Sequence, residues 1–182
     1  MSRHAGAVHG RSSRRVLPFR RAIGAIACVA LLALPSSAAA QAPGLGGDGW
    51  RVGMTLGGIS TFGISFEVFR DSRSVDVTLG TFGFRDLGVY VGGRQYFFER
   101  AARPFVGLGL WGIVSWTAPR NGYALVARAP LGVDWNFTHG HAVGAEIGVS
   151  RALAIRRPEP DDDRELNKRL VPLPGIYYRW AP

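Results

Sequence analysis

Residues 125–137, Leu-Val-Ala-Arg-Ala-Pro-Leu-Gly-Val-Asp-Trp-Asn-Phe, decide the fold of this chain. The side chains of a β-strand point alternately to opposite faces, so odd and even positions form two separate rows. The row of even positions carries polar residues and glycine: Arg128, Gly132, Asp134 and Asn136. The row of odd positions is apolar throughout: Leu125, Ala127, Ala129, Leu131, Val133, Trp135 and Phe137. The stretch therefore predicts a strand with one apolar face and one face of glycine and isolated charges.

The same alternation recurs elsewhere, most clearly at residues 50–56 and 143–149. In a soluble sheet with one solvated face, the polar face meets water and is rich in Lys, Glu and Thr. Here the polar row consists largely of glycine with single charges, which suits a narrow enclosed interior. We therefore expect the apolar row to face outward and the charged row to be enclosed.

The N-terminus has the order of segments that is typical of a secretory signal peptide. Basic residues between Arg11 and Arg21 precede the apolar run Ala22–Leu34, and small residues follow as far as Ala40. The apolar run is shorter than the roughly 20 residues that a membrane-spanning helix needs. We predict a signal peptide over residues 1–40, cleavage after Ala40 and a single mature domain over residues 41–182.

Cleavage would change what the composition implies. Residues 1–40 hold six of the 22 basic residues and no acidic residue, so 16 basic residues would remain against 13 acidic ones. The basic character of the whole chain is therefore no argument for a nucleic-acid partner. The only cysteine, Cys28, would leave as well, and the mature domain could form neither a disulfide nor a cysteine nucleophile.

We expect an all-β domain, because no long stretch shows a convincing helical apolar period. Eight strands are predicted, at Trp50–Leu56, Phe62–Phe69, Ser74–Thr81, Leu87–Phe97, Phe105–Val114, Ala124–Phe137, His141–Leu153 and Gly175–Trp180. Short connections alternate with two longer polar ones, Ser115–Tyr123 and Ala154–Pro174, as in a transmembrane β-barrel. Aromatic residues are expected to form a belt at one rim: Trp50, Phe69, Phe97, Phe98, Phe105, Trp135, Phe137, Tyr178 and Trp180.

Three segments resemble small eight-stranded outer-membrane barrels of the OmpA/OmpX type: Tyr90–Phe97, Arg103–Gly109 and Ile176–Trp180. The resemblance covers about residues 49–180 and rests on pattern. It implies an eight-stranded antiparallel up-and-down transmembrane β-barrel in a bacterial outer membrane, in contact with outer-membrane lipid and lipopolysaccharide. It also implies insertion by the outer-membrane assembly machinery, which reads a C-terminal strand ending in an aromatic residue. Trp180 fits that signal, whereas Ala181 and Pro182 depart from it.

Placing the apolar row outside encloses four basic and four acidic residues: Arg51, Glu67, Asp76, Arg94, Arg128, Asp134, Glu146 and Arg179. Buried charges are tolerated when they are paired and hydrogen-bonded, so we expect a salt-bridge network. The interior of an eight-stranded barrel is just wide enough for side chains to fill. The sequence therefore predicts a plugged interior, in which glycines make room for long arginine side chains.

Several positions fit this register poorly. Trp111 and Ile113 fall on the interior row, and Gln95 falls on the outer row. Proline cannot donate to a strand ladder, which makes Pro130 in the sixth predicted strand and Pro172 and Pro174 before the last one difficult to place. At Pro130 we expect a β-bulge.

No catalytic, cofactor or metal site is predicted. Glu146 and Asp134 could form an acid/base pair, but structural ion-pair networks imitate such pairs, and we favour the structural interpretation. His139 and His141 flank a turn glycine without an evident third metal ligand. They also lack the His-x-Ser-Asn context of small barrels that deacylate lipid A. We therefore do not expect an enzyme.

The charged segment around Asp161–Glu165 is interpreted as a solvated loop. A more specific alternative is contact with lipopolysaccharide phosphates, partly through bridging divalent ions, by Arg151, Arg156, Arg157, Lys168 and Arg169.

The leading interpretation is an integral outer-membrane protein with a structural, adhesive or envelope-integrity role. One alternative is a soluble periplasmic lipocalin-like barrel that binds an apolar ligand, which would need the apolar row inside. Another is an outer-membrane lipid-modifying hydrolase, whose motif is missing. A fold of this kind hosts many roles, so the sequence does not identify a biological process.

Overall fold

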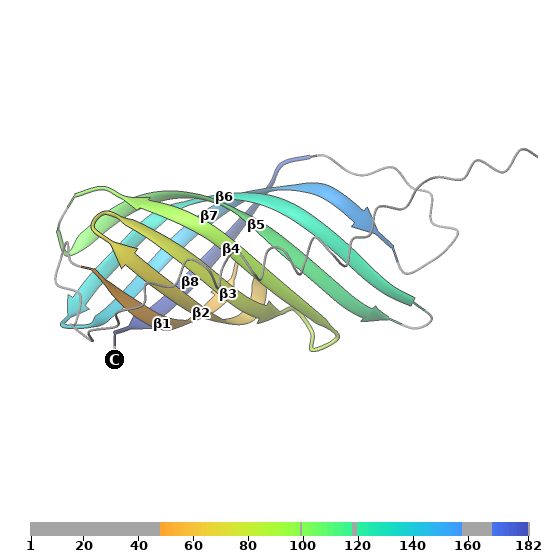
Figure 1. The fold of residues 1–182 in the computed structure, drawn as a ribbon, viewed down its shortest axis with the longest axis horizontal. Coiled ribbons are helices and arrows are strands. Elements are labelled where there is room, and N and C mark those ends of the chain that lie inside the picture. The colour runs from red at the N-terminus through yellow and green to blue at the C-terminus, as the bar shows by residue number, and fades with distance from the viewer. Residues whose placement is uncertain (1–47, 99, 118–119, 158–168, 182) are drawn as a thin grey trace, which may run out of the picture.

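The computed structural model describes residues 48–98, 100–117, 120–157 and 169–181. They form a closed barrel in which each strand pairs antiparallel with the next and the last pairs with the first (Figure 1). The strands are β1 (Gly49–Gly57), β2 (Ser60–Arg70), β3 (Arg73–Thr81), β4 (Asp86–Tyr96), β5 (Ala102–Thr117), β6 (Arg120–Thr138), β7 (His141–Arg156) and β8 (Val171–Trp180). The predicted fold class, all-β with eight antiparallel strands in an up-and-down barrel, is confirmed. The predicted signal peptide and Lys168 lie outside the described residues.

The strands differ in length, and this changes one predicted connection. β1 has 9 residues and β6 has 19. In Figure 1 the wall made by β5 and β6 extends well past the connection between β1 and β2. The expected long loop at Ser115–Tyr123 is wrong, because Ser115 pairs with Gly122 and Thr117 with Arg120. These residues continue the β5–β6 ladder instead of leaving it.

The barrel has two different ends. At the terminal end, β1 begins, β8 ends and the turns between β2 and β3, β4 and β5, and β6 and β7 lie together (Figure 1). At the loop end, β1 passes into β2 through Gly57 and Gly58, both with positive φ (76° and 70°), which glycine adopts without strain. This turn brings Ile59 into a buried apolar cluster with Tyr90, Trp111 and Val126.

The apolar cluster explains two of the residues that fit the register poorly. Trp111 is buried in it, and Ile113 packs against it, so both face inward as their positions in the strand require. The interior is therefore apolar toward the loop end. Gln95 does lie on the outer face, but close to a turn, where it accepts a hydrogen bond from Arg73 at 3.1 Å and donates one to Ser72.

The expected aromatic belt is wrong at two positions. Phe69 and Phe105 are buried inside the terminal end, where they form a cluster with Tyr96 and Tyr177. Both share the inward parity of a charged residue two positions earlier in their strands, Glu67 and Arg103. An outer series of neighbouring rings does run across β6, β7 and β8, through Trp135, Phe137, His141, Tyr178 and Trp180.

The bulge expected at Pro130 is also wrong. Pro130 faces the interior and pairs with Gly148, and the β5–β6 register is the same before and after it. The β6–β7 register instead shifts between Leu125 and Val126, where Leu153 of β7 has no paired residue.

The two prolines of β8 sit where the ladder does not need a donor. Pro174 accepts a hydrogen bond from the Gly58 N–H at 2.7 Å, so its backbone polar side faces β1. Pro172 has the same parity and lies beyond the last pair of the β1–β8 ladder, Gly57 with Gly175. Proline is tolerated at such an edge because no hydrogen bond is lost there.

Interior glycines make room for bulky side chains, as expected for the arginines. A Cβ at Gly148 would overlap the guanidinium of Arg128, and one at Gly53 would lie 2.6 Å from the Arg179 Cγ. Others lie beneath aromatic rings: a Cβ at Gly92 would meet Tyr90, and one at Gly144 would meet Tyr177. The glycine row thus provides space for rings as well as for arginines.

We predict that Gly148→Val lowers the free energy of unfolding by about 1–3 kcal/mol, because the added atoms displace the Arg128 guanidinium. Gly112→Val is the matched control, since a Cβ at Gly112 would meet only the Val89 carbonyl oxygen, at 3.9 Å. The measurement is urea unfolding of the folded barrel, followed by tryptophan fluorescence. Equal losses in the two variants would contradict this account of the interior.

Candidate functional site

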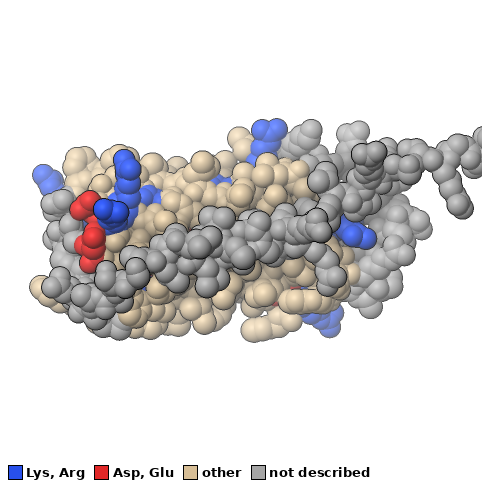
Figure 2. Space-filling view, in the orientation of Figure 1, with Lys and Arg blue, Asp and Glu red and all other residues tan. Residues whose placement is uncertain are grey.

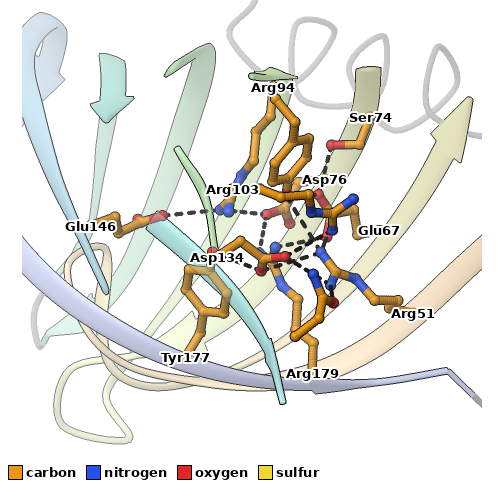
Figure 3. Close-up of polar contacts among 12 residues, drawn as sticks. Arg51, Glu67, Ser74, Asp76, Arg94, Arg103, Asp134, Glu146, Tyr177 and Arg179 are labelled. Atoms are coloured by element: carbon orange, nitrogen blue, oxygen red, sulfur yellow. Dashed lines mark hydrogen bonds and ion pairs between the residues drawn. The ribbon is translucent and has the colours of Figure 1, made fainter. Parts of the chain in front are cut away.

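All eight residues predicted to face inward do so, and they meet in the interior (Figure 3, in which Arg128 is not labelled). Seven of them are buried, with Glu67, Asp76, Asp134 and Arg179 at 0 % exposure. The eighth, Glu146, has a side chain that is 13 % exposed. The pairing of the strands brings these residues close together along the barrel axis, and the alternation of each strand turns their side chains inward. The predicted interior network is therefore present.

The structure adds a ninth member that the sequence analysis missed. Arg103 lies at the start of β5 and contacts Asp134 at 2.9 Å. The strand predicted to begin at Phe105 begins at Ala102, three residues earlier, so the predicted strand left Arg103 out. Extending the inward row of Phe105 and Gly107 back by two residues would have found it.

These residues form one alternating series of ion pairs, here called the ion-pair network. Its order is Arg128–Glu146–Arg94–Asp76–Arg179–Glu67–Arg51–Asp134–Arg103, with N–O distances of 2.7–3.1 Å. Each carboxylate contacts two arginines, and an arginine stands at both ends. Within the network there is consequently one more positive charge than negative charge.

The ion-pair network draws a residue from every strand, and several of its contacts cross the interior. Arg51 on β1 reaches Asp134 on β6, and Arg94 on β4 reaches Glu146 on β7. Figure 3 shows these side chains converging from surrounding strands on the middle of the barrel. The network therefore ties together strands that share no backbone hydrogen bonds.

Glu67 is the most connected carboxylate. Its Oε2 accepts hydrogen bonds from Arg51 at 3.0 Å and from Arg179 at 2.7 Å. Its Oε1 accepts from the hydroxyl groups of Ser74 and Tyr96, each at 2.6 Å. Four donors around one buried carboxylate compensate for its lost hydration, which is the condition for burying such a charge.

Aromatic faces cover the arginine side chains on their remaining sides. The Cζ atom lies 4.0–4.7 Å from a ring centroid in four pairs: Arg179 with Tyr177, Arg51 with Phe69, Arg94 with Phe105, and Arg103 with Tyr96. Such cation–π contacts are stronger where water is excluded. The cluster of aromatic residues at the terminal end is thus continuous with the ion-pair network.

This arrangement does not bring Glu146 and Asp134 together as an acid/base pair. Glu146 contacts Arg94 and Arg128, whereas Asp134 contacts Arg51 and Arg103. Within the described residues, no three His, Cys, Asp or Glu side chains are placed to hold a metal ion. His141 Nδ1 lies 2.6 Å from the Tyr178 hydroxyl oxygen, and its ring stacks on that of Tyr178.

The arginines considered for lipopolysaccharide contact lie toward the loop end. Arg151 and Arg156 are exposed on β7, where they pair with Ala127 and Tyr123 of the outer row. The unpaired Leu153 lies between them and shifts the alternation by one residue. Arg151 and Arg156 therefore share the outer face, although their spacing of five would place them on opposite faces of a regular strand. Arg157 follows directly after β7, and Arg169 precedes β8.

Comparisons with family models, curated proteins and solved structures found no match for the chain. Within the part of the chain that the structure describes, no helix has the length and apolar character to cross a membrane.

We predict that Glu67→Gln lowers the free energy of unfolding by about 3–5 kcal/mol, because it leaves Arg51 and Arg179 facing a neutral amide in a buried site. Asp48→Asn serves as the control, since Asp48 is an exposed carboxylate before β1 and its loss should change stability by less than about 0.5 kcal/mol. Denaturant unfolding of both variants tests this. A Glu67→Gln protein as stable as the parent would contradict the structural role of the network.

Proposed function

We propose that the chain is an integral outer-membrane protein with a structural, adhesive or envelope-integrity role. One observation carries the proposal: the charged side chains of the ion-pair network are enclosed, while large apolar side chains are exposed along the outer wall. Exposed on the barrel wall are, among others, Met54, Leu56, Ile64, Phe66, Leu79, Val106, Leu108, Leu131, Val133, Ile147 and Ile176. In Figure 2 the part of the middle of this face that is not grey is mainly tan, and charged atoms lie mostly toward the two ends.

The extent of the apolar surface favours lipid over water as its surroundings. A soluble monomer seldom exposes a continuous apolar patch beyond a few hundred Å². In a closed barrel the backbone N–H and C=O groups of every strand can pair with those of its two neighbours. Hydrocarbon requires this of a structure that spans a membrane, because no water is present there to bind them. The strands have 9–19 residues, and a tilted spanning strand needs about 9–11. The outer ring series at the terminal end fits an interfacial aromatic girdle.

The interior supports a non-catalytic role within this proposal. Each carboxylate is held between two arginines, so its charge serves to cross-link strands. A lipocalin-like barrel, the alternative from another class, would need an apolar cavity where this barrel holds the ion-pair network. We further propose that the outer-membrane assembly machinery inserts the chain, with the terminal end toward the periplasm.

The proposal predicts that the protein sediments with outer membranes when it is expressed in a Gram-negative cell. It should resist extraction by alkaline carbonate and be released only by detergent, because its outer wall is apolar. Immunoblots of separated membrane and periplasmic fractions make the measurement, with a soluble periplasmic protein as the control. Recovery in the soluble periplasmic fraction would instead favour the lipocalin-like alternative.

A second part of the proposal concerns lipopolysaccharide. The shift at Leu153 turns both Arg151 and Arg156 outward near the loop end, where phosphate groups of the outer leaflet would lie. Guanidinium groups bind phosphate through charge-assisted hydrogen bonds. Arg157, Lys168 and Arg169 are further candidates from the sequence.

Replacing Arg151 and Arg156 by serine should reduce the lipopolysaccharide that co-purifies with the barrel. The control replaces Arg70 and Arg73 by serine as well; these two arginines lie at the terminal end and would face the other leaflet. Phosphate analysis of the purified proteins compares the two. Equal lipid content in both double variants would refute this contact while leaving the membrane proposal intact.

A further inference from the structure

A small cavity lies beside the ion-pair network, on its side toward the loop end. Its volume is ≈ 20 Å³, and its lining includes Thr55, Tyr90, Arg94, Arg128, Glu146 and Tyr177. A cavity needs about 10–15 Å³ by this measure to hold a water molecule. The site is therefore large enough for one small ligand and too small for an organic molecule.

Three residues of the lining have buried polar atoms without a hydrogen-bond partner. These atoms are the hydroxyl oxygens of Thr55 and Tyr90 and the Nε and Nη1 nitrogens of Arg94. Tyr90 is 3 % exposed and Arg94 is 6 % exposed, so bulk water does not satisfy these groups. Arg94 uses only Nη2, which contacts Asp76 and Glu146. Leaving such groups unpaired is costly, and the cavity is where a partner can sit.

The chemistry of these atoms selects an acceptor. A guanidinium only donates hydrogen bonds, and both hydroxyl groups can donate. A water molecule could accept two hydrogen bonds from Arg94 and donate its two hydrogens to the hydroxyl oxygens, so hydrogen bonding alone admits water as well as an anion. An anion accepts every bond and donates none. Glu146 also lines the cavity, but its two oxygens already accept from Arg94 and Arg128.

The charge of the ion-pair network favours an anion over water. Because the network begins and ends with arginine, it carries one positive charge more than its four carboxylates balance. Arg128, the end that lines the cavity, is 1 % exposed, so solvent does little to offset its charge. A single monovalent anion in the cavity would bring the network to neutrality.

We propose that this cavity is a binding site for one chloride ion, held by Arg94 and by the hydroxyl groups of Tyr90 and Thr55. The bound ion completes the hydrogen bonding of Arg94 and stabilises the folded barrel. The inference depends on the interior alone and is independent of whether the outer wall contacts lipid.

The first test compares unfolding of the folded protein in sodium chloride and in sodium gluconate at equal ionic strength. Gluconate is too large for the cavity, so only chloride should raise the urea midpoint, and the rise should saturate. Crystals grown in sodium bromide should show an anomalous peak within hydrogen-bond distance of Arg94. Identical midpoints in the two salts, or ordered water without a bromide signal, would overturn the proposal.

Two tyrosine variants separate the site from the rest of the interior. Tyr90→Phe removes one hydroxyl group of the lining, and we expect the chloride concentration for half-maximal stabilisation to rise roughly 2–10-fold. Tyr96→Phe is the matched control, because its buried hydroxyl group donates to Glu67 and does not line the cavity. Tyr96→Phe should lower stability without changing the chloride dependence. The same change of chloride dependence in both variants would also count against the site.

Discussion

The structure depends on one constraint: a charge enclosed in a narrow barrel must be paired, because the interior offers little water to solvate it. The alternating series of arginines and carboxylates meets this constraint with contacts between side chains of all eight strands. A broken contact near the middle would leave charge uncompensated on both sides, since each carboxylate serves two arginines. The network therefore favours one register and one closure of the barrel over neighbouring alternatives.

The apolar character of the outer wall follows from the alternation of side chains along each strand. The interior holds the charged side chains, the glycines and two buried apolar clusters, and the alternate positions of the strands carry the apolar side chains that cover the outside. The interior is itself divided, with the ion-pair network and its aromatic cluster toward the terminal end and the Ile59–Trp111 cluster toward the loop end. Ile59 reaches this cluster because β1 is short and turns inward at Gly57 and Gly58. The enclosed charges are thereby covered by apolar side chains on the side of the loops.

Much of this could be predicted from the sequence, because alternation alone assigns each residue of a strand to one face. Asp134 and Glu146 were placed inside in this way, and the eight strands were found with approximate bounds. The errors at Phe69 and Arg103 arose where alternation was applied incompletely, and the β-bulge predicted at Pro130 is wrong because the register of β6 and β7 shifts opposite Leu153 instead. The pairing order of the network could not be predicted, because it depends on the offset between strands that are distant in the sequence, such as β4 and β7.

The most direct test of the whole account is the environment of the outer row in the folded protein. Single cysteines carrying nitroxide spin labels at Leu131 and Ile147 can be examined in lipid vesicles, with a label at Asp71 in the turn after β2 as the aqueous reference. The account predicts that the first two labels collide readily with oxygen and scarcely with a polar nickel complex, and that the third does the opposite. Labels at Leu131 and Ile147 that are relaxed by the nickel complex, or shielded from both reagents, would contradict it.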